Sequence, residues 1–178
     1  PSKVEEIKKI LKKFKIQLIE DAAEALGSFY KQKHLGTFGD LGILSFNGNK
    51  IITTGGGGAV LTNNKKYAKK LKFLSTTAKL PHPWKFEYAE TGYNYRLPGL
   101  NAALGCSQLK KIESYIKNKR KLFKIYSKNF SQSQSFKIFK EPKNSRSNYW
   151  LQTIILNKRS YSIRNKLIKS SNEKGFST

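Results

Sequence analysis

Lys50 stands in a sequence setting that suits a reactive amine. It is the only Lys or Arg between Lys33 and Lys65, and the apolar pair Ile51-Ile52 and the glycine run Gly55–Gly58 follow it. An amine among apolar residues is poorly hydrated, and desolvation lowers the pKa of a lysine. A lysine of this kind is a usable nucleophile and base, as Schiff-base chemistry requires. We therefore expect Lys50 to carry covalent chemistry.

A hydroxyl and a run of glycines flank this lysine. Gly55–Gly58 permit positive φ angles and a close approach of the backbone, so that the run could cradle a phosphate. No Gly-Lys-Ser/Thr follows, which excludes a Walker-type loop. A flexible turn is the alternative for the glycines. Ser45 either donates its hydroxyl to a phosphate or only completes a strand.

Three of the 11 acidic residues lie within five positions, at Glu20, Asp21 and Glu24. They follow the short apolar segment Ile16–Ile19. Open α/β sheets bind ligands where their strands end, and a carboxylate there can be held ionised by a cationic partner. The alternative is that one of these carboxylates only caps the following turn.

A third cluster of candidate residues comprises Gly92–Ala103. It contains Asn94 and Arg96, and Arg96 is one of only five arginines in the chain. Arg96 precedes a predicted helix, and a helix N-terminus favours anions. The alternative is a loop that enters the helix and packs its tyrosines.

The elements that must position these residues alternate between helix and strand. The expected strands span residues 16–19, 41–46, 59–62 and 149–156. The expected helices, with apolar residues at helical spacing, span 2–14, 67–74, 100–126 and 161–174. Prolines make residues 79–98 a loop, and the Ser-, Gln- and Lys-rich segment 131–148 is typical of a linker. Helices interleaved with short strands favour a layered α/β fold.

Composition excludes several other classes of protein. No apolar run reaches the roughly 18 residues that a membrane span needs, so we expect no membrane partner. The single cysteine, Cys106, cannot form an internal disulfide, which makes a cytoplasmic location the default. Two histidines and one cysteine far apart in the sequence offer no metal spacing, so we expect no metal site.

The net charge of +24 raises the prospect of an anionic partner. Residues 108–174 contain 18 basic and 3 acidic residues, whereas residues 20–60 are nearly neutral. Most of the basic residues are lysines, although arginine is the better reader of phosphates and bases. These observations favour a solvated basic surface over a nucleic-acid site.

Together, the three clusters resemble the DegT/StrS-type sugar aminotransferases, which are fold type I pyridoxal-phosphate enzymes. The matching stretches are Leu18–Ser28, Gly39–Phe46, Asn47–Gly58 and Gly92–Gln108. The set of motifs is specific, although no single motif is. The resemblance extends from Pro1 to about Phe130 and continues more faintly to Thr178.

The resemblance implies a role for each candidate residue. Lys50 is the residue that forms the Schiff base with pyridoxal 5'-phosphate, and Asp21 pairs with the pyridinium nitrogen. Glu24 occupies a position close to the cofactor ring, and Ser45 binds the cofactor phosphate.

The resemblance also implies a homodimer with shared active sites. Asn94 would reach the cofactor phosphate of the neighbouring subunit, and Arg96 would contact substrate across that interface. The implied reaction moves an amino group, usually from glutamate, to a nucleotide-linked keto sugar in polysaccharide or amino-sugar biosynthesis. Related enzymes that dehydrate their substrate carry His in place of the lysine, so Lys50 favours amino transfer.

The implied fold class is α/β: part of a fold type I large domain, with a mixed sheet flanked by helices, and the start of a small C-terminal α+β domain. We expect the large domain at residues 1–130, the linker at 131–148 and the small domain from 149 to 178. The family has more chain at both ends, so we expect an internal fragment. A truncated inactive relic and a basic nucleic-acid-binding module are the alternatives.

Overall fold

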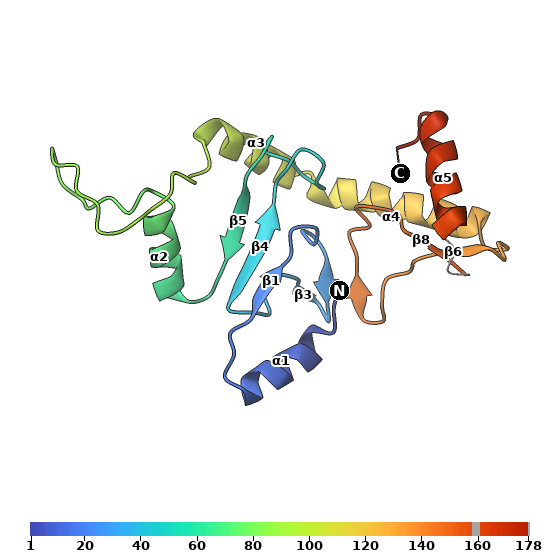
Figure 1. Ribbon diagram of the computed structural model, residues 1–178, viewed down its shortest axis with the longest axis horizontal. Coiled ribbons are helices and arrows are strands. Elements are labelled where there is room, and N and C mark those ends of the chain that lie inside the picture. The colour runs from blue at the N-terminus through green and yellow to red at the C-terminus, as the bar shows by residue number, and fades with distance from the viewer. Residues whose placement is uncertain (158–160, 178) are drawn as a thin grey trace.

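A computed structural model describes residues 1–157 and 161–177 (Figure 1). The helices in the described residues are α1 (Val4–Lys13), α2 (Lys65–Leu74), α3 (Gly99–Leu109), α4 (Ile112–Asn129) and α5 (Tyr161–Glu173). The strands are β1 (Ile19–Asp21), β2 (Phe29–Tyr30), β3 (Lys33–His34), β4 (Leu41–Ser45), β5 (Gly58–Leu61), β6 (Phe136–Ile138), β7 (Ser145–Arg146) and β8 (Ile154–Leu156). The expected alternation of helices and strands is therefore present.

The central sheet has the strand order β1-β4-β5 and is mixed, as expected. Strands β1 and β4 are parallel, with Asp21 opposite Ile43, whereas β4 and β5 are antiparallel, with Ser45 opposite Gly58. Because β1 and β4 run in the same direction, Asp21 and Ser45 both lie at the carboxyl edge of this sheet. That edge is where open α/β sheets bind their ligands.

Strand β1 begins later than the apolar segment 16–19 predicts. Lys15 has a φ of 54°, and the N–H of Ile16 bonds back to the carbonyl of Leu11 at 2.9 Å, so these residues close the end of α1. The N–H of Leu18 is held by the carboxylate of Asp40 at 2.8 Å. The ladder with β4 therefore starts at Ile19, and Asp21 ends the strand.

The single helix predicted over residues 100–126 is wrong, because α3 and α4 are separate. The N–H of Lys111 bonds to the carbonyl of Gln108 at 2.9 Å, three residues back. Such a short-range bond tightens the chain and ends the regular α-helical ladder. Helix α4 then packs against the loop after β1, where Ile116 is fully buried beside Gly27. A Cβ at Gly27 would clash with Ile116, and the φ of Gly27 is +77°.

The segment 131–148, expected as a linker, carries the strands β6 and β7. Strand β7 pairs with β2 next to the central sheet, and β6 pairs with β8. The strand predicted over 149–156 is shorter than expected, since β8 begins only at Ile154 and Tyr149 has a φ of 46°. The expected second unit, residues 149–178, includes residues 158–160 and 178, which lie outside the described residues.

The loop at residues 79–98 projects from the left-hand end of the molecule in Figure 1, at the opposite end from α5. Its base is tied to the end of α2, because Tyr93 and Tyr95 donate backbone N–H groups to the carbonyls of Leu74 and Ser75. Its aromatic side chains include Trp84, which is 75% exposed. The predicted loop is therefore present.

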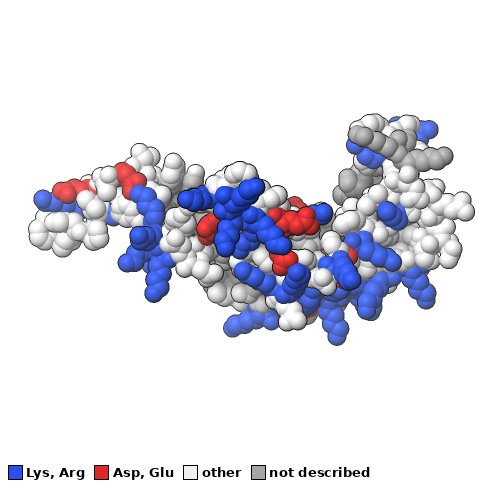
Figure 2. Space-filling model, turned by 90° about the horizontal axis from the view of Figure 1, so that it is seen from below, with Lys and Arg blue, Asp and Glu red and all other residues white. Residues whose placement is uncertain are grey.

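Basic side chains cover much of the surface that Figure 2 shows. On α4, Lys117, Lys121, Lys124 and Lys128 are exposed and lie three or four residues apart, which places them on one helical face. No helix among the described residues combines the length and apolar character that a membrane crossing requires. Within residues 1–157 and 161–177, no cluster of His, Cys, Asp and Glu side chains is suited to a metal ion.

Candidate active site

Lys50 lies in the connection between β4 and β5. Its N–H bonds to the carbonyl of Asn47 at 3.1 Å, which makes a tight turn, and Asn47 in turn donates its N–H to the hydroxyl of Ser45 at 3.3 Å. The Lys50 side chain is only 14% exposed. The Lys50 side chain is therefore largely shielded from solvent, as expected for a lysine with apolar neighbours in the sequence.

Two side chains contact the Lys50 amine. Its Nζ atom is 3.4 Å from Oε1 of Glu24 and 4.3 Å from the ring centroid of Trp150. The indole N–H of Trp150 also donates to the carbonyl of Asn49 at 2.6 Å. Lys50 and Glu24 are thus brought together as expected, whereas Trp150 was not among the predicted site residues.

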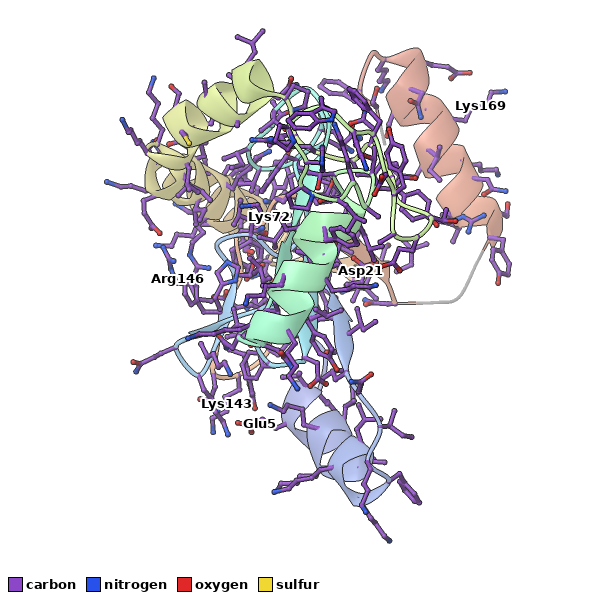
Figure 3. All side chains as sticks on the ribbon, turned by 90° about the vertical axis from the view of Figure 1, so that its left-hand side faces the viewer. Glu5, Asp21, Lys72, Lys143, Arg146 and Lys169 are labelled. Atoms are coloured by element: carbon purple, nitrogen blue, oxygen red, sulfur yellow. The ribbon has the colours of Figure 1, made fainter. Side chains whose placement is uncertain are left out.

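Asp21 ends β1, beside the loop that carries Glu24. Its side chain is exposed, and Oδ1 accepts the N–H of Ala23 at 3.2 Å. In Figure 3, Asp21 lies above α1 and on the opposite side of the view from Arg146. Asp21 is therefore an exposed carboxylate at the end of a strand, where a polar partner can reach it.

Glu20, the third carboxylate of the predicted cluster, has a structural role. It accepts the backbone N–H groups of Gly36 at 2.9 Å, Phe38 at 2.5 Å and Gly39 at 2.6 Å. These bonds fix the turn that leads into β4. Glu20 therefore stabilises the turn at residues 36–39, and it is Asp21, through its bond to the N–H of Ala23, that caps the segment directly after β1.

The glycine run after Lys50 takes part in the sheet. Gly58 belongs to β5 opposite Ser45, and the carbonyl of Gly57 accepts the N–H of Phe46 at 2.9 Å. Gly57 has a φ of 98°, which side chains rarely adopt. The run thus returns the chain from Lys50 to the sheet, and Ser45 remains half-buried at the same edge.

Asn94 and Arg96 lie in the projecting loop and are exposed. Asn94 pairs as an isolated bridge with Thr76 near the end of α2. Within the described part of the chain, neither side chain forms a hydrogen bond or ion pair with Lys50 or Asp21. The structure therefore does not bring them into the Lys50 cluster of the same chain.

Asn148 connects the Glu24 loop with Trp150. It was not among the predicted site residues. Its Nδ2 atom donates to the carbonyls of Glu24 at 2.9 Å and Leu26 at 3.0 Å, and its Oδ1 accepts the N–H of Trp150 at 3.0 Å. Asn148 is 4% exposed, and its N–H donates to the hydroxyl of Ser28. The sequence offers only a weak signal for Asn148, because asparagine is common in turns, where its side chain often bonds to the backbone two residues further along the chain.

An ion pair behind the site fixes the segment that contains Asn148. Arg120 on α4 donates to both oxygens of Glu141, at 2.9 and 2.8 Å, and to the carbonyl of Ser147 at 2.7 Å. Burial of the Glu141 carboxyl favours its neutral form, but the Arg120 guanidinium and the N–H of Ser147 outweigh burial and lower its pKa. Burial raises the pKa of Tyr149, whose hydroxyl accepts the N–H of Glu141.

An open cavity of about 850 Å³ lies beside these groups. Its lining includes Asp21, Glu24, Asn148 and Trp150, together with residues of α1 and of the segment before β8. Lys50 contacts two of these lining residues, Glu24 and Trp150. The site thus combines an amine, two carboxylates and an aromatic ring at the edge of a cavity that can admit a small molecule.

Curated relatives match this chain in sequence. The GDP-perosamine synthase of Escherichia coli O157:H7 is 38% identical over 155 residues, which cover 87% of this chain and 42% of that protein. The UDP-4-amino-4,6-dideoxy-N-acetyl-beta-L-altrosamine transaminase of Campylobacter jejuni (strain 81-176) is 37% identical over 168 residues, which cover 94% and 45%. The chain thus spans less than half the length of either relative.

A solved structure matches the fold. PseC of Helicobacter pylori, an aminotransferase involved in the biosynthesis of pseudoaminic acid, has a TM-score of 0.92 and 28% sequence identity, and the match covers 98% of this chain and 47% of that one. The fold is therefore that of part of a fold type I aminotransferase. The family model described as the DegT/DnrJ/EryC1/StrS aminotransferase family matches residues 1–178. The chain belongs to this family.

Proposed function

We propose that this chain carries the cofactor-binding lysine of a pyridoxal-phosphate-dependent enzyme that moves an amino group, from glutamate, to a nucleotide-linked keto sugar. The observation that carries the proposal is the Lys50 amine, held against Trp150 and Glu24 beside an open cavity. The names of the GDP- and UDP-sugar relatives support the substrate class.

The residues at the sheet edge fit pyridoxal phosphate. The cofactor needs an amine for its aldehyde, an acid for its ring nitrogen and donors for its phosphate. Lys50, Asp21 and the Ser45 hydroxyl supply these groups from the ends of two parallel strands and the turn that follows one of them. We assign Lys50 to the aldehyde, Asp21 to the ring nitrogen, Ser45 to the phosphate and Glu24 to the neighbourhood of the ring.

Pyridoxal phosphate supplies, when bound, an electron-withdrawing ring that stabilises negative charge on the substrate carbon. Asp21 would keep a proton on the ring nitrogen through its negative charge. The Lys50 amine, when it carries no covalent bond, would take the proton from the substrate carbon at Nζ and deliver it to the carbon that holds the nitrogen after transfer. Because a lysine holds this position, the proposal favours amino transfer over dehydration.

The projecting loop supports a shared site in a homodimer. Asn94 and Arg96 are exposed on the loop at the opposite end of the molecule from α5 (Figure 1). We assign Asn94 to the cofactor phosphate and Arg96 to the substrate of a neighbouring subunit. The same proposal divides the chain into a large domain, a linker at 131–148 and a small domain from 149 onward. It also includes a cytoplasmic location.

Covalent trapping tests the assignment of Lys50. The protein is mixed with pyridoxal phosphate and reduced with borohydride, and its peptides are mapped by mass spectrometry. We expect a stable label on Lys50 and none in Lys50→Ala, whereas Lys33→Ala, which removes a charge elsewhere, keeps the label. A label on another lysine would refute the assignment. Amino transfer is measured with glutamate and GDP- or UDP-linked keto sugars, and no product with either sugar would refute the substrate class.

A further inference from the structure

The indole of Trp150 holds both the amine of Lys50 and the backbone that precedes it. The Lys50 Nζ lies 4.3 Å from the ring centroid, inside the roughly 6 Å over which a cation is attracted to an aromatic face. The indole N–H is bonded to the carbonyl of Asn49, which immediately precedes the lysine. The ring is therefore fixed relative to the amine by a second, independent bond.

Glu24 contacts the same amine but is more open to water. Its side chain is 66% exposed, whereas that of Lys50 is 14% exposed. An ion pair with one exposed partner is screened and adds little stability. The aromatic ring lies over the amine and is held by its own bond to Asn49, so we infer that it is the contact that most determines where Nζ lies.

One asparagine holds both of these partners in place. Asn148 donates to the carbonyl of Glu24 and accepts the N–H of Trp150. Glu24 and Trp150 are more than 120 residues apart in the sequence, and this buried side chain sets their separation. The two contacts of the Lys50 amine thus form one preorganised unit.

We propose that Trp150 and Glu24 form a resting site for the ammonium of Lys50, which this side chain occupies when no cofactor is bound. This inference rests on the proposed function, because only a lysine that bonds and is released needs such a site. Trp150 is then a positioning residue that keeps the Lys50 amine within reach of the cavity.

Amine labelling tests the resting site without any cofactor. The cofactor-free protein is treated with acetic anhydride at one fixed pH, and the peptide that contains Lys50 is quantified by mass spectrometry. In Trp150→Leu, the labelling rate of Lys50 rises about threefold, since the amine loses its aromatic partner. Trp150→Phe, which keeps a weaker aromatic face, gives an intermediate value, and Lys33 serves as the unchanged reference.

Equal labelling rates for Lys50 in the unsubstituted protein and Trp150→Leu would overturn the resting site. If Trp150 had only a structural role, leucine and phenylalanine would change the rate of Lys50 equally, because the aromatic face would not matter. Trapping of pyridoxal phosphate on Lys50 is measured in parallel. Absence of this label refutes the proposed function, whereas a label together with unchanged acetylation rates refutes the resting site alone.

Fluorescence gives a second readout in which Trp150 is retained. The chain has two tryptophans, and the other, Trp84, lies exposed on the projecting loop. In Trp84→Phe, all indole emission comes from Trp150. We expect its emission wavelength to shift when Lys50→Met removes the charge at the ring and to return toward the original value in Lys50→Arg. Identical emission in all three forms would overturn the contact.

Discussion

Replacement of Asn148 with aspartate is expected to destabilise the loop that carries the site. The two side chains have almost the same shape, so the change is one of chemistry alone. Nδ2 of Asn148 donates to the carbonyls of Glu24 and Leu26. In Asn148→Asp, an oxygen without a hydrogen faces these two carbonyl oxygens, in a position that is 4% exposed.

The magnitude follows from the groups that lose their partner. A buried polar group left without a hydrogen bond costs about 1–3 kcal/mol, and two carbonyls lose their donor here. We therefore expect a loss of about 3 kcal/mol in the free energy of unfolding, which lowers the Tm of a chain of this length by about 10 °C. A charged aspartate that finds no cation would increase this loss further.

Urea unfolding followed by circular dichroism measures the effect, with Asn118→Asp as the matched control. Asn118 lies exposed on α4, so the same substitution there changes stability by no more than about 0.5 kcal/mol. If Asn148→Asp were as stable as the control, the inferred coupling between the Glu24 loop and Trp150 would be refuted.

Three further substitutions test the structural roles of Glu141, Glu20 and Gly42. The lowered pKa of Glu141 contributes stability that is present above the ordinary value of 4.5 and is lost as the pH falls through the lower folded value. Glu141→Gln does not have this loss, so its deficit in unfolding free energy, about 1 kcal/mol at neutral pH, shrinks in urea unfolding as the pH falls below 4.5; a deficit that stays constant with pH would contradict this. Glu20→Gln weakens bonds to three backbone N–H groups and lowers unfolding stability by about 2 kcal/mol in urea; an unchanged midpoint would refute the role of Glu20. Gly42→Ala places a Cβ against the backbone carbonyl of Gly36 and abolishes cooperative thermal unfolding, whereas Gly48→Ala meets open space and leaves it intact.

Local patterns were sufficient to predict two strands of the central sheet, β4 and β5, and to single out Lys50 as a candidate. Strands β4 and β5 match the predicted segments closely because each is a short apolar run bounded by turn residues. Lys50 stood out because the nearest basic residues are 15 or more positions away. The family resemblance, which depends on short motifs in a given order, is confirmed by the match over residues 1–178.

The division of the helix at residues 100–126 and the late start of β8 were not predictable in the same way. Apolar spacing continues through the bend at Lys111, because the bend changes only backbone hydrogen bonds and not the side-chain pattern. Similarly, Tyr149 has a positive φ within a run that favours a strand, so tertiary contacts override the local preference there.

The sequence by itself determined the amine, the carboxylates and the strands that present them, since these depend on residues close together along the chain. Only the tertiary structure decided that Asn148 and Trp150 complete the surroundings of Lys50. The bonds from Asn148 to the Glu24 loop span more than 120 residues, and the contact of Trp150 with Lys50 spans 100. No local periodicity records contacts at such a separation, because they form only when α4 and the strands pack together.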